Sequence, residues 1–202
     1  MQTIDLSYIE KKNNNYLLKI SFAENQNGII YRVTAVLFAH DWDIVEAIAE
    51  TVDENLVKDV FIIKSMTNEK LDGDSLFTIK HELNQLFYTD LTIENYFISY
   101  RKNIQKYKRN ESSIVHIFNP SSIDSTVLDI RTYDRPGLLF EISYFLYQKE
   151  IDIISFTAKS EGKEIRDSFL LVKSNGEKIS DEFCETLRLE LLDLLKLKDI
   201  AI

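Results

Sequence analysis

The second half of the chain alternates between two hydrophobic periods. Residues 126–133 mix β-branched and aromatic residues with polar ones, which is typical of a strand. Apolar residues then recur every three or four positions, which predicts one face of a helix. The elements expected in this half are a strand at 126–133, a helix with the apolar face Leu138, Ile142, Phe145 and Leu146, strands at 151–158 and 165–173 joined by a tight turn at 161–163, a second helix capped by Ser180 or Asp181 with the face Phe183, Leu187, Leu191, Leu194 and Leu195, and a short strand near 197–202.

The first half repeats this order of elements. Its helices are predicted from apolar residues at helical spacing, and its strands from runs rich in β-branched and aromatic residues. The first helix has the face Ile29, Val33, Val36 and Leu37, the second has the face Leu76, Ile79, Leu83, Leu86 and Phe87, and strands are expected near 16–23, 42–52, 57–66 and 91–100.

The two halves align when the sequence is shifted by 109 or 110 residues. Matches spread over the whole length of the unit indicate a duplication of about a hundred residues. We therefore expect a first domain at 1–102, a basic linker at 103–112 and a second domain at 113–202. The matching segments are 3–8 with 113–118, 17–20 with 127–130, Gly28 with Gly137, 43–45 with 152–154, and 64–65 with 173–174.

The order β-α-β-β-α-β in each half predicts the α+β class, with two ferredoxin-like βαββαβ domains. The right-handed crossover rule places both helices on one face of a four-stranded antiparallel sheet. The other face is bare, and in the second half it carries either Leu170 and Val172 or Phe169 and Leu171. Because neither pair is polar, we expect a partner: the other copy, through the sheet edge or the sheet face, and then a second chain. The pairing of 3–8 and 113–118 stays open between extra edge strands and a swapped fourth strand.

The loop between the first strand and the first helix of the second half carries the candidate chemistry. Pro136 has a fixed φ, Gly137 has a permissive one, and a helix follows at once. This turn gathers backbone N–H groups and a helix N-terminus around one small space, where the carboxylate of an amino acid fits. The alternative is a turn without a ligand, in which Asp134 and Gly137 are only cap and turn residues and Arg135 is an ordinary exposed arginine.

Charge and hydropathy limit the partners. Acidic residues outnumber basic ones by 33 to 24, and the net charge of −9 argues against nucleic acid and anionic membranes as main partners. The basic run at 101–113 is interpreted as a solvated linker. No apolar run approaches ~18 residues, and no basic segment followed by an apolar one opens the chain, so we expect a cytoplasmic protein.

The acidic pairs that could bind a metal lack the Gly-Ser motif that accompanies such pairs in magnesium sites. An Asp-x-Asp pair for magnesium needs a Gly-Ser motif before it, and no such motif precedes either candidate pair. The candidate pairs are Asp41 with Asp43 and Asp72 with Asp74.

The histidines and the cysteine also lack the neighbouring residues that catalysis or metal binding would need. His40 and Asp41 form a His-Asp pair, but the remaining His81 and His116 lie in different segments. Cys184 is the single cysteine, so no internal disulfide can form, and no histidine is near it in the sequence to activate it. We expect no enzyme activity, no cofactor and no metal.

Three stretches of the second half together resemble the ACT domain. Residues 134–139 read Asp-Arg-Pro-Gly-Leu-Leu, residues 152–158 read Asp-Ile-Ile-Ser-Phe-Thr-Ala, and residues 167–172 read Asp-Ser-Phe-Leu-Leu-Val. The lead-in at 115–128 is similar to that of the last ACT repeat in bacterial PII uridylyltransferase/uridylyl-removing enzymes and in plant ACT-repeat proteins. The resemblance covers nearly the whole chain, and in the first half it rests on the internal repeat.

The resemblance implies ligand sites at interfaces between paired domains, with glutamine as the ligand of the similar uridylyltransferases. It places the ligand against the loop before the first helix and the start of the second strand of a neighbouring domain. In the first copy this loop lacks Asp, Arg and Pro and is one residue longer. The implied ligand-binding residues are Asp134, Arg135, Pro136, Gly137 and Leu138 with Ile153 and Ser155, and in the first copy Asn27, Gly28 and Ile29 with Ile44 and Glu46.

The sequence therefore predicts a non-catalytic regulatory protein. It would bind a small ligand, such as the amino acid glutamine, between its domains and change how they pair, as a homodimer that controls an enzyme partner. The alternative is a ligand-free ACT scaffold used for dimerisation or protein docking. Acylphosphatase shares this strand and helix order, but its Gly-rich phosphate loop with paired Arg and Asn is absent, so catalysis has little support.

Overall fold

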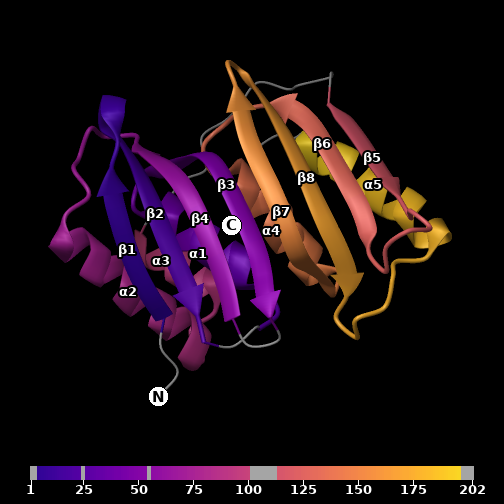
Figure 1. Cartoon of the computed structure of the whole chain (residues 1–202), viewed down its shortest axis with the longest axis horizontal. Helices are drawn as coiled ribbons and strands as arrows, with labels where there is room; N and C mark the ends of the chain where they lie inside the picture. Colours follow the sequence, from indigo (N-terminus) through magenta and orange to yellow (C-terminus); the bar gives the residue numbers. More distant parts are fainter. Residues whose placement is uncertain (1–3, 24–25, 54–55, 101–112, 197–202) are drawn as a thin grey trace.

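The computed structural model describes residues 4–23, 26–53, 56–100 and 113–196. They form one antiparallel eight-stranded sheet with all the helices on one of its faces, an α+β fold (Figure 1). The strand order is β1-β2-β4-β3-β7-β8-β6-β5, so each half contributes four neighbouring strands. No helix in this part of the chain is long and apolar enough to cross a membrane.

The elements of the first half follow the expected order up to the second helix. They are β1 (Ile4–Glu10), a short 3₁₀ turn (Lys12–Asn14), β2 (Asn15–Phe22), α1 (Ile29–Ala39), β3 (Trp42–Asp53), β4 (Leu56–Ser65), α2 (Gly73–Tyr88) and α3 (Ile93–Tyr100).

The second half matches it, and its described residues, which end at Lys196, contain no counterpart of α3. Its elements are β5 (Ile114–Phe118), β6 (Thr126–Tyr133), α4 (Leu138–Gln148), β7 (Ile151–Glu161), β8 (Glu164–Lys173) and α5 (Asp181–Leu195), and Ser180 is the residue that caps α5. The linker expected at 103–112 and the strand expected near 197–202 lie outside the described residues.

Strand alternation decides which apolar set faces the helices. On β8, Phe169 and Leu171 are fully buried beneath the helices, whereas Leu170 and Val172 are half-buried on the opposite face. The open face of the sheet therefore carries Leu170 and Val172, one of the two sets left open by the sequence.

Of the two segments whose pairing was left open, the described parts form the outer strands of the sheet, β1 (Ile4–Glu10) and β5 (Ile114–Phe118). β1 pairs with β2 and β5 pairs with β6, both antiparallel. These are the positions beside the first strand of each unit where a fourth strand of a βαββαβ domain would lie. The described order in each half is accordingly ββαββα, with the outer strand supplied from before the unit.

The strand predicted near 91–100 is wrong, because these residues form α3. Aromatic and β-branched content suggested a strand, but the buried residues Ile93, Tyr96 and Phe97 lie three and four positions apart, which is helical spacing. The Thr92 hydroxyl accepts a hydrogen bond from the Asn95 amide at 3.3 Å and caps the helix. Since β1 already occupies the place beside β2, no edge is left there for another strand.

The two halves join through the edges of β3 and β7. Five residue pairs run antiparallel from Glu46 opposite Lys159 to Glu50 opposite Ser155. Behind this seam α1 packs against α4, and the hydroxyls of Thr34 and Ser143 lie 3.3 Å apart. Of the pairings left open by the sequence, the structure has the edge-to-edge one.

Two buried carboxyls occupy matching places on the helix side of the sheet. Asp59 on β4 is opposite Ile20, and Asp167 on β8 is opposite Ile130. Neither oxygen of Asp59 has a hydrogen-bond partner, and burial raises its pKa from 3.8 to about 7. Burial likewise raises the pKa of Asp167 to about 7, although the Lys159 amide donates to it at 3.3 Å.

Because Asp59 is buried, we expect the free energy of unfolding to depend on pH. Asp59→Asn should make this pH dependence smaller. A folded-state pKa raised above the unfolded one means that the folded protein binds the proton more tightly, so stability is greatest at low pH and falls as pH rises from about 4 to about 7. Denaturant unfolding at about pH 5 and pH 8 should show Asp59→Asn gaining about 2 kcal/mol relative to the native chain at the higher pH. The exposed Asp5→Asn is the control, and equal pH slopes for the native and Asp59→Asn chains would contradict the prediction.

Candidate functional site

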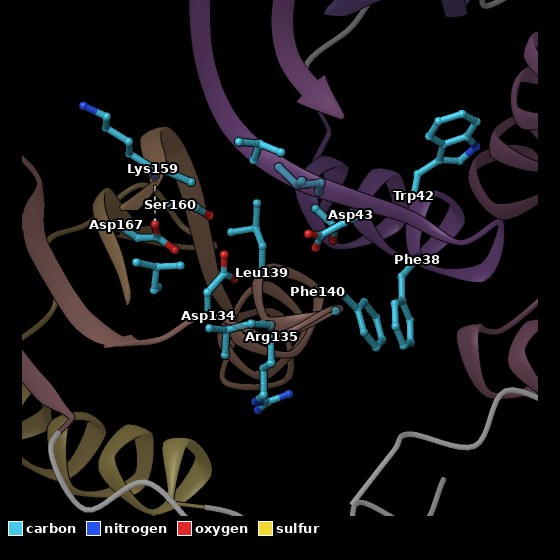
Figure 2. Close-up of a pocket in the computed structure, with 17 residues that line it drawn as sticks. Phe38, Trp42, Asp43, Asp134, Arg135, Leu139, Phe140, Lys159, Ser160 and Asp167 are labelled. Carbon is cyan, nitrogen blue, oxygen red and sulfur yellow. Dashed lines mark hydrogen bonds between the residues drawn. The ribbon is translucent and has the colours of Figure 1, made fainter. Parts of the chain in front are cut away.

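A small hollow lies where the loop before α4 meets the first half of the chain. Its wall comes from this loop and the first turn of α4, from the end of α1 with the start of β3, and from β7 and β8 (Figure 2). The residues that line it are Thr34, Phe38, Trp42, Asp43, Ile44, Val45, Asp134, Arg135, Gly137, Leu138, Leu139, Phe140, Ala158, Lys159, Ser160, Ile165 and Asp167.

The loop is fixed by its backbone and by one aromatic ring. Gly137 has the left-handed conformation (φ 77°), directly before the first residue of α4. A Cβ built on Gly137 would lie 3.0 Å from the ring of Phe38, which belongs to α1 of the other half. The Asp134 amide donates to the Lys163 carbonyl at 2.9 Å, which anchors the start of the loop. Glycine is therefore required twice over, by its φ and by the approach of Phe38.

Three carboxyl groups line the hollow: Asp43, Asp134 and Asp167. Burial, and after it the charge of Asp134, raises the pKa of Asp43 to about 6. The basic residues of the wall, Arg135 and Lys159, turn their charged ends away from the hollow in Figure 2. The hollow is therefore a place where a cation would be stabilised.

The guanidinium of Arg135 is held by Glu141 on α4. Its two terminal nitrogens donate to the two carboxylate oxygens, a bidentate pair whose side chains are only 12% and 4% exposed. Sequence reasoning treated Arg135 as a ligand residue or an exposed arginine, and it missed Glu141. The available signal was an acidic residue inside the apolar start of a helix, where burial requires a partner.

The structure brings five of the predicted residues to the hollow and places the others elsewhere. Asp134, Arg135, Gly137 and Leu138 meet Ile44 of the first half there, and Pro136 lines an adjoining hollow of about 310 Å³. Glu46 and Ser155 face the open side of the sheet, opposite Lys159 and Leu170 respectively. Ile153 lies on β7, and Asn27, Gly28 and Ile29 lie at the start of α1.

A matching place exists beneath α1, and aromatic side chains fill it. Gly28 has φ 79°, and a Cβ there would lie 2.4 Å from Tyr31 and 2.8 Å from Tyr147. The Gly28 amide donates to the Asp152 carboxylate of the other half at 3.5 Å. Arg32 donates to the Gly28 carbonyl at 3.2 Å and lies over the Tyr31 ring. The first copy thus meets its glycine with an internal carboxylate and two rings.

Asp43 and Phe38 are site residues that sequence reasoning missed. Asp43 was considered only as a metal ligand, although the repeat aligns it with Asp152, and Phe38 aligns with Tyr147 at the same shift. Asp167 gave no signal beyond its place in the family-like run 167–172.

The histidine and cysteine candidates serve the packing of helices. The His40 imidazole lies 2.7 Å from the Glu82 carboxylate, which also accepts from the hydroxyls of Tyr96 and Tyr100 and ties α3 to α1 and α2. The Cys184 thiol is buried, and burial raises its pKa. Within the residues that the structure describes, no group of three His, Cys, Asp or Glu could hold a metal.

Comparisons with known proteins find relatives of low sequence identity. No family model matches the chain. A bifunctional uridylyltransferase/uridylyl-removing enzyme of Azospirillum brasilense is 25% identical over 80% of this chain and 18% of its own length, and one of Ruegeria pomeroyi is 26% identical over 77% and 17%. One of Idiomarina loihiensis is 20% identical over 95% of this chain and 22% of its own length.

Among solved structures, aspartate kinase from Synechocystis matches 91% of this chain and 28% of its own length, with a TM-score of 0.47 and 15% identity. The chain spans about a fifth of the length of the curated relatives. These relatives are enzymes of the kind that the resemblance at residues 134–139 and 152–172 pointed to, and the fold has two ACT-like units joined edge to edge.

Gly137→Ala should destabilise the chain more than Gly162→Ala. Gly162 also has a positive φ (69°), but a Cβ there meets nothing within 4 Å. Gly162→Ala should therefore lower the free energy of unfolding only by the cost of an alanine at positive φ, about 1 kcal/mol. Contact with Phe38 should add about another 1 kcal/mol at Gly137. Denaturant midpoints measure both, and combining Gly137→Ala with Phe38→Leu should recover part of the difference. Equal losses at the two glycines would show that the approach of Phe38 is unimportant.

Proposed function

We propose that this chain is a non-catalytic regulatory protein that binds a free amino acid in the hollow beneath α4. The observation that carries the proposal is the cluster of Asp43, Asp134 and Asp167 beside the N-terminus of α4, at the junction of the two halves. Such a place offers stabilisation to a positive and a negative group at once, and an α-amino acid carries both.

The ammonium group of the ligand would lie among the three carboxyl groups of the hollow. Asp43 is half-buried and Asp167 is buried, and the pKa of each carboxyl is raised because desolvation disfavours its charge. An ammonium group placed between them and Asp134 would supply the missing positive charge. The energy lost in burying the carboxylates is then partly regained in the complex, and it becomes binding energy.

The carboxylate of the ligand would face the first turn of α4. Backbone amides of a first helical turn have no acceptor within the helix, and the helix dipole favours a negative charge there. The first copy supports this placement, because its Gly28 amide donates to the carboxylate of Asp152. In the second copy Asp43 aligns with Asp152, and each of these carboxyls accepts a backbone hydrogen bond from the residue that follows it, Ile44 or Ile153. We infer that the ligand carboxylate occupies the equivalent place near Gly137.

Ligand binding in the hollow would change how the two halves of the chain are arranged. The hollow measures about 30 Å³, which is room for about one or two water molecules. The adjoining hollow of about 310 Å³ shares Asp43, Asp134 and Arg135 and would take the rest of the ligand. A ligand in these two hollows contacts both the loop at 134–138 and the start of β3, and by linkage its binding favours the arrangement of the halves that accommodates it.

The similarity to uridylyltransferase/uridylyl-removing enzymes makes glutamine the first ligand to test. In this proposal a partner enzyme reads the arrangement of the two halves, and the protein acts in the cytoplasm as a homodimer. The alternative is a ligand-free scaffold for docking or dimerisation. The aromatic filling of the matching place beneath α1 favours that alternative, because it shows that this fold stays complete with the ligand space closed.

Calorimetric titration of the chain with glutamine and the other standard amino acids tests the proposal. At least one should release or absorb heat with one site per chain, and Asp43→Asn should weaken it by about tenfold or more, because a charged hydrogen bond is lost. The exposed Asp5→Asn should bind as the native chain does. Absence of heat with every amino acid, for a chain that is folded by circular dichroism, would leave the scaffold as the function.

Binding should also weaken in mild acid. The ligand ammonium favours ionised Asp43, whose pKa is about 6 in the free protein, so at lower pH the ligand must displace a proton. We expect the dissociation constant to rise about tenfold from pH 7.5 to pH 5. Asp43→Asn should flatten this profile, and a native profile that is already flat would remove Asp43 from the site.

A further inference from the structure

The outer edge of β5 is exposed and uncharged. β5 pairs with β6 on one side, and among the described residues no strand lies on its other side. Ile114 and Phe118 point to the open face of the sheet and are 45% and 47% exposed, and His116 lies between them. Val115 faces the helices and is buried where α5 covers the strand. An edge with free backbone groups and apolar side chains is a template for another strand.

The opposite edge of the sheet is protected in the usual way. β1 carries the charged residues Asp5 and Glu10, and Asp5 lies 3.6 Å from the Lys80 amine of α2. Charges on an edge strand discourage pairing with another chain. Of the two edges, β5 is therefore the one suited to continue the sheet.

The sequence of β5 is complementary to itself. If two β5 strands run antiparallel about a twofold axis at His116, Ile114 of one strand faces Phe118 of the other on the open side. Val115 then faces Ile117 on the helix side. Both are apolar cross-strand pairs, which stabilise a sheet, and a twofold interface uses the same patch on both copies. A shift by one residue would turn each exposed apolar side chain toward the wrong face.

The chain already uses this kind of contact internally. Its two halves join by five antiparallel residue pairs between β3 and β7, and β5 offers five residues for the same arrangement. Continuation at β5 would extend the same sheet without changing its twist or the side on which the helices lie (Figure 1).

The geometry points to β5 as the interface through which two copies of this chain form a twofold dimer with one continuous sheet. The dimer requires no ligand, so it stands or falls independently of amino-acid binding. It leaves the hollow beneath α4 accessible, because that hollow lies at the β3–β7 seam, three strands from β5.

His116→Lys is the variant that tests the interface. Within the chain residue 116 is opposite Asp129, so a lysine is favourable there and folding is preserved. Across the twofold axis two lysines would face each other directly, which opposes pairing. Ile9→Lys introduces the same charge on the other edge strand and is the matched control.

Sedimentation or light scattering at sub-millimolar concentration should give twice the 23.6 kDa chain mass for the native protein and for Ile9→Lys. His116→Lys should give the single-chain mass. A native monomer, or a His116→Lys dimer, would overturn the assignment.

A cysteine at the axis gives a second and positive test. Directly opposite residues in an antiparallel pair have Cα atoms about 4.5–5.5 Å apart, which a disulfide can span. His116→Cys should therefore cross-link into covalent dimers under mild oxidation, whereas Ile9→Cys should not. The native Cys184 is buried and does not interfere. A dimer whose His116→Cys variant fails to cross-link would place the interface somewhere else on the chain.

Discussion

The antiparallel pairing of β3 with β7 is the contact on which the rest of the structure depends. It merges two four-stranded sheets into one, and it brings α1 and α4 together behind the seam. Because the halves meet there, the loop before each of these helices lies against the other half. Phe38 reaches Gly137, and Tyr147 reaches Gly28, only as a result of that pairing. The candidate site is thus a property of the junction and belongs to neither half alone.

The two copies resolve the same geometry in different ways. Beneath α1 the glycine amide meets Asp152, and Tyr31 and Tyr147 occupy the space. Beneath α4 a hollow remains, and it is lined by carboxyl groups whose ionisation is made unfavourable by burial. Beneath α1 the charged partner of the glycine amide comes from the chain itself, whereas beneath α4 a ligand would supply it. Divergence after duplication has therefore separated a structural junction from a candidate binding junction.

Sequence patterns predicted the regular elements well where local spacing was decisive. The strands β6, β7 and β8 and the helices α4 and α5 follow from apolar periodicity alone. The segment after α2 failed, because its aromatic residues suited either a strand or a helix, and tertiary packing chose the helix. The hydroxyls of Tyr96 and Tyr100 reach Glu82 from that helix. No local rule shows that β1 has already taken the edge beside β2.

The sequence by itself determined the repeat, the Pro-Gly turn before α4 and the class of the fold, since each follows from the types of residue and their spacing along the chain. Only the tertiary structure decided that the halves join edge to edge and that Arg135 is held by Glu141. The same holds for the meeting of Asp43 with Asp134 and Asp167 in one hollow. The junction and the meeting of Asp43 with the other two carboxyls depend on contacts between segments far apart in the chain, and the Arg135–Glu141 pair is buried only once the loop and α4 have folded. Burial then sets the pKa of each carboxyl, and burial is a property of the folded molecule as a whole.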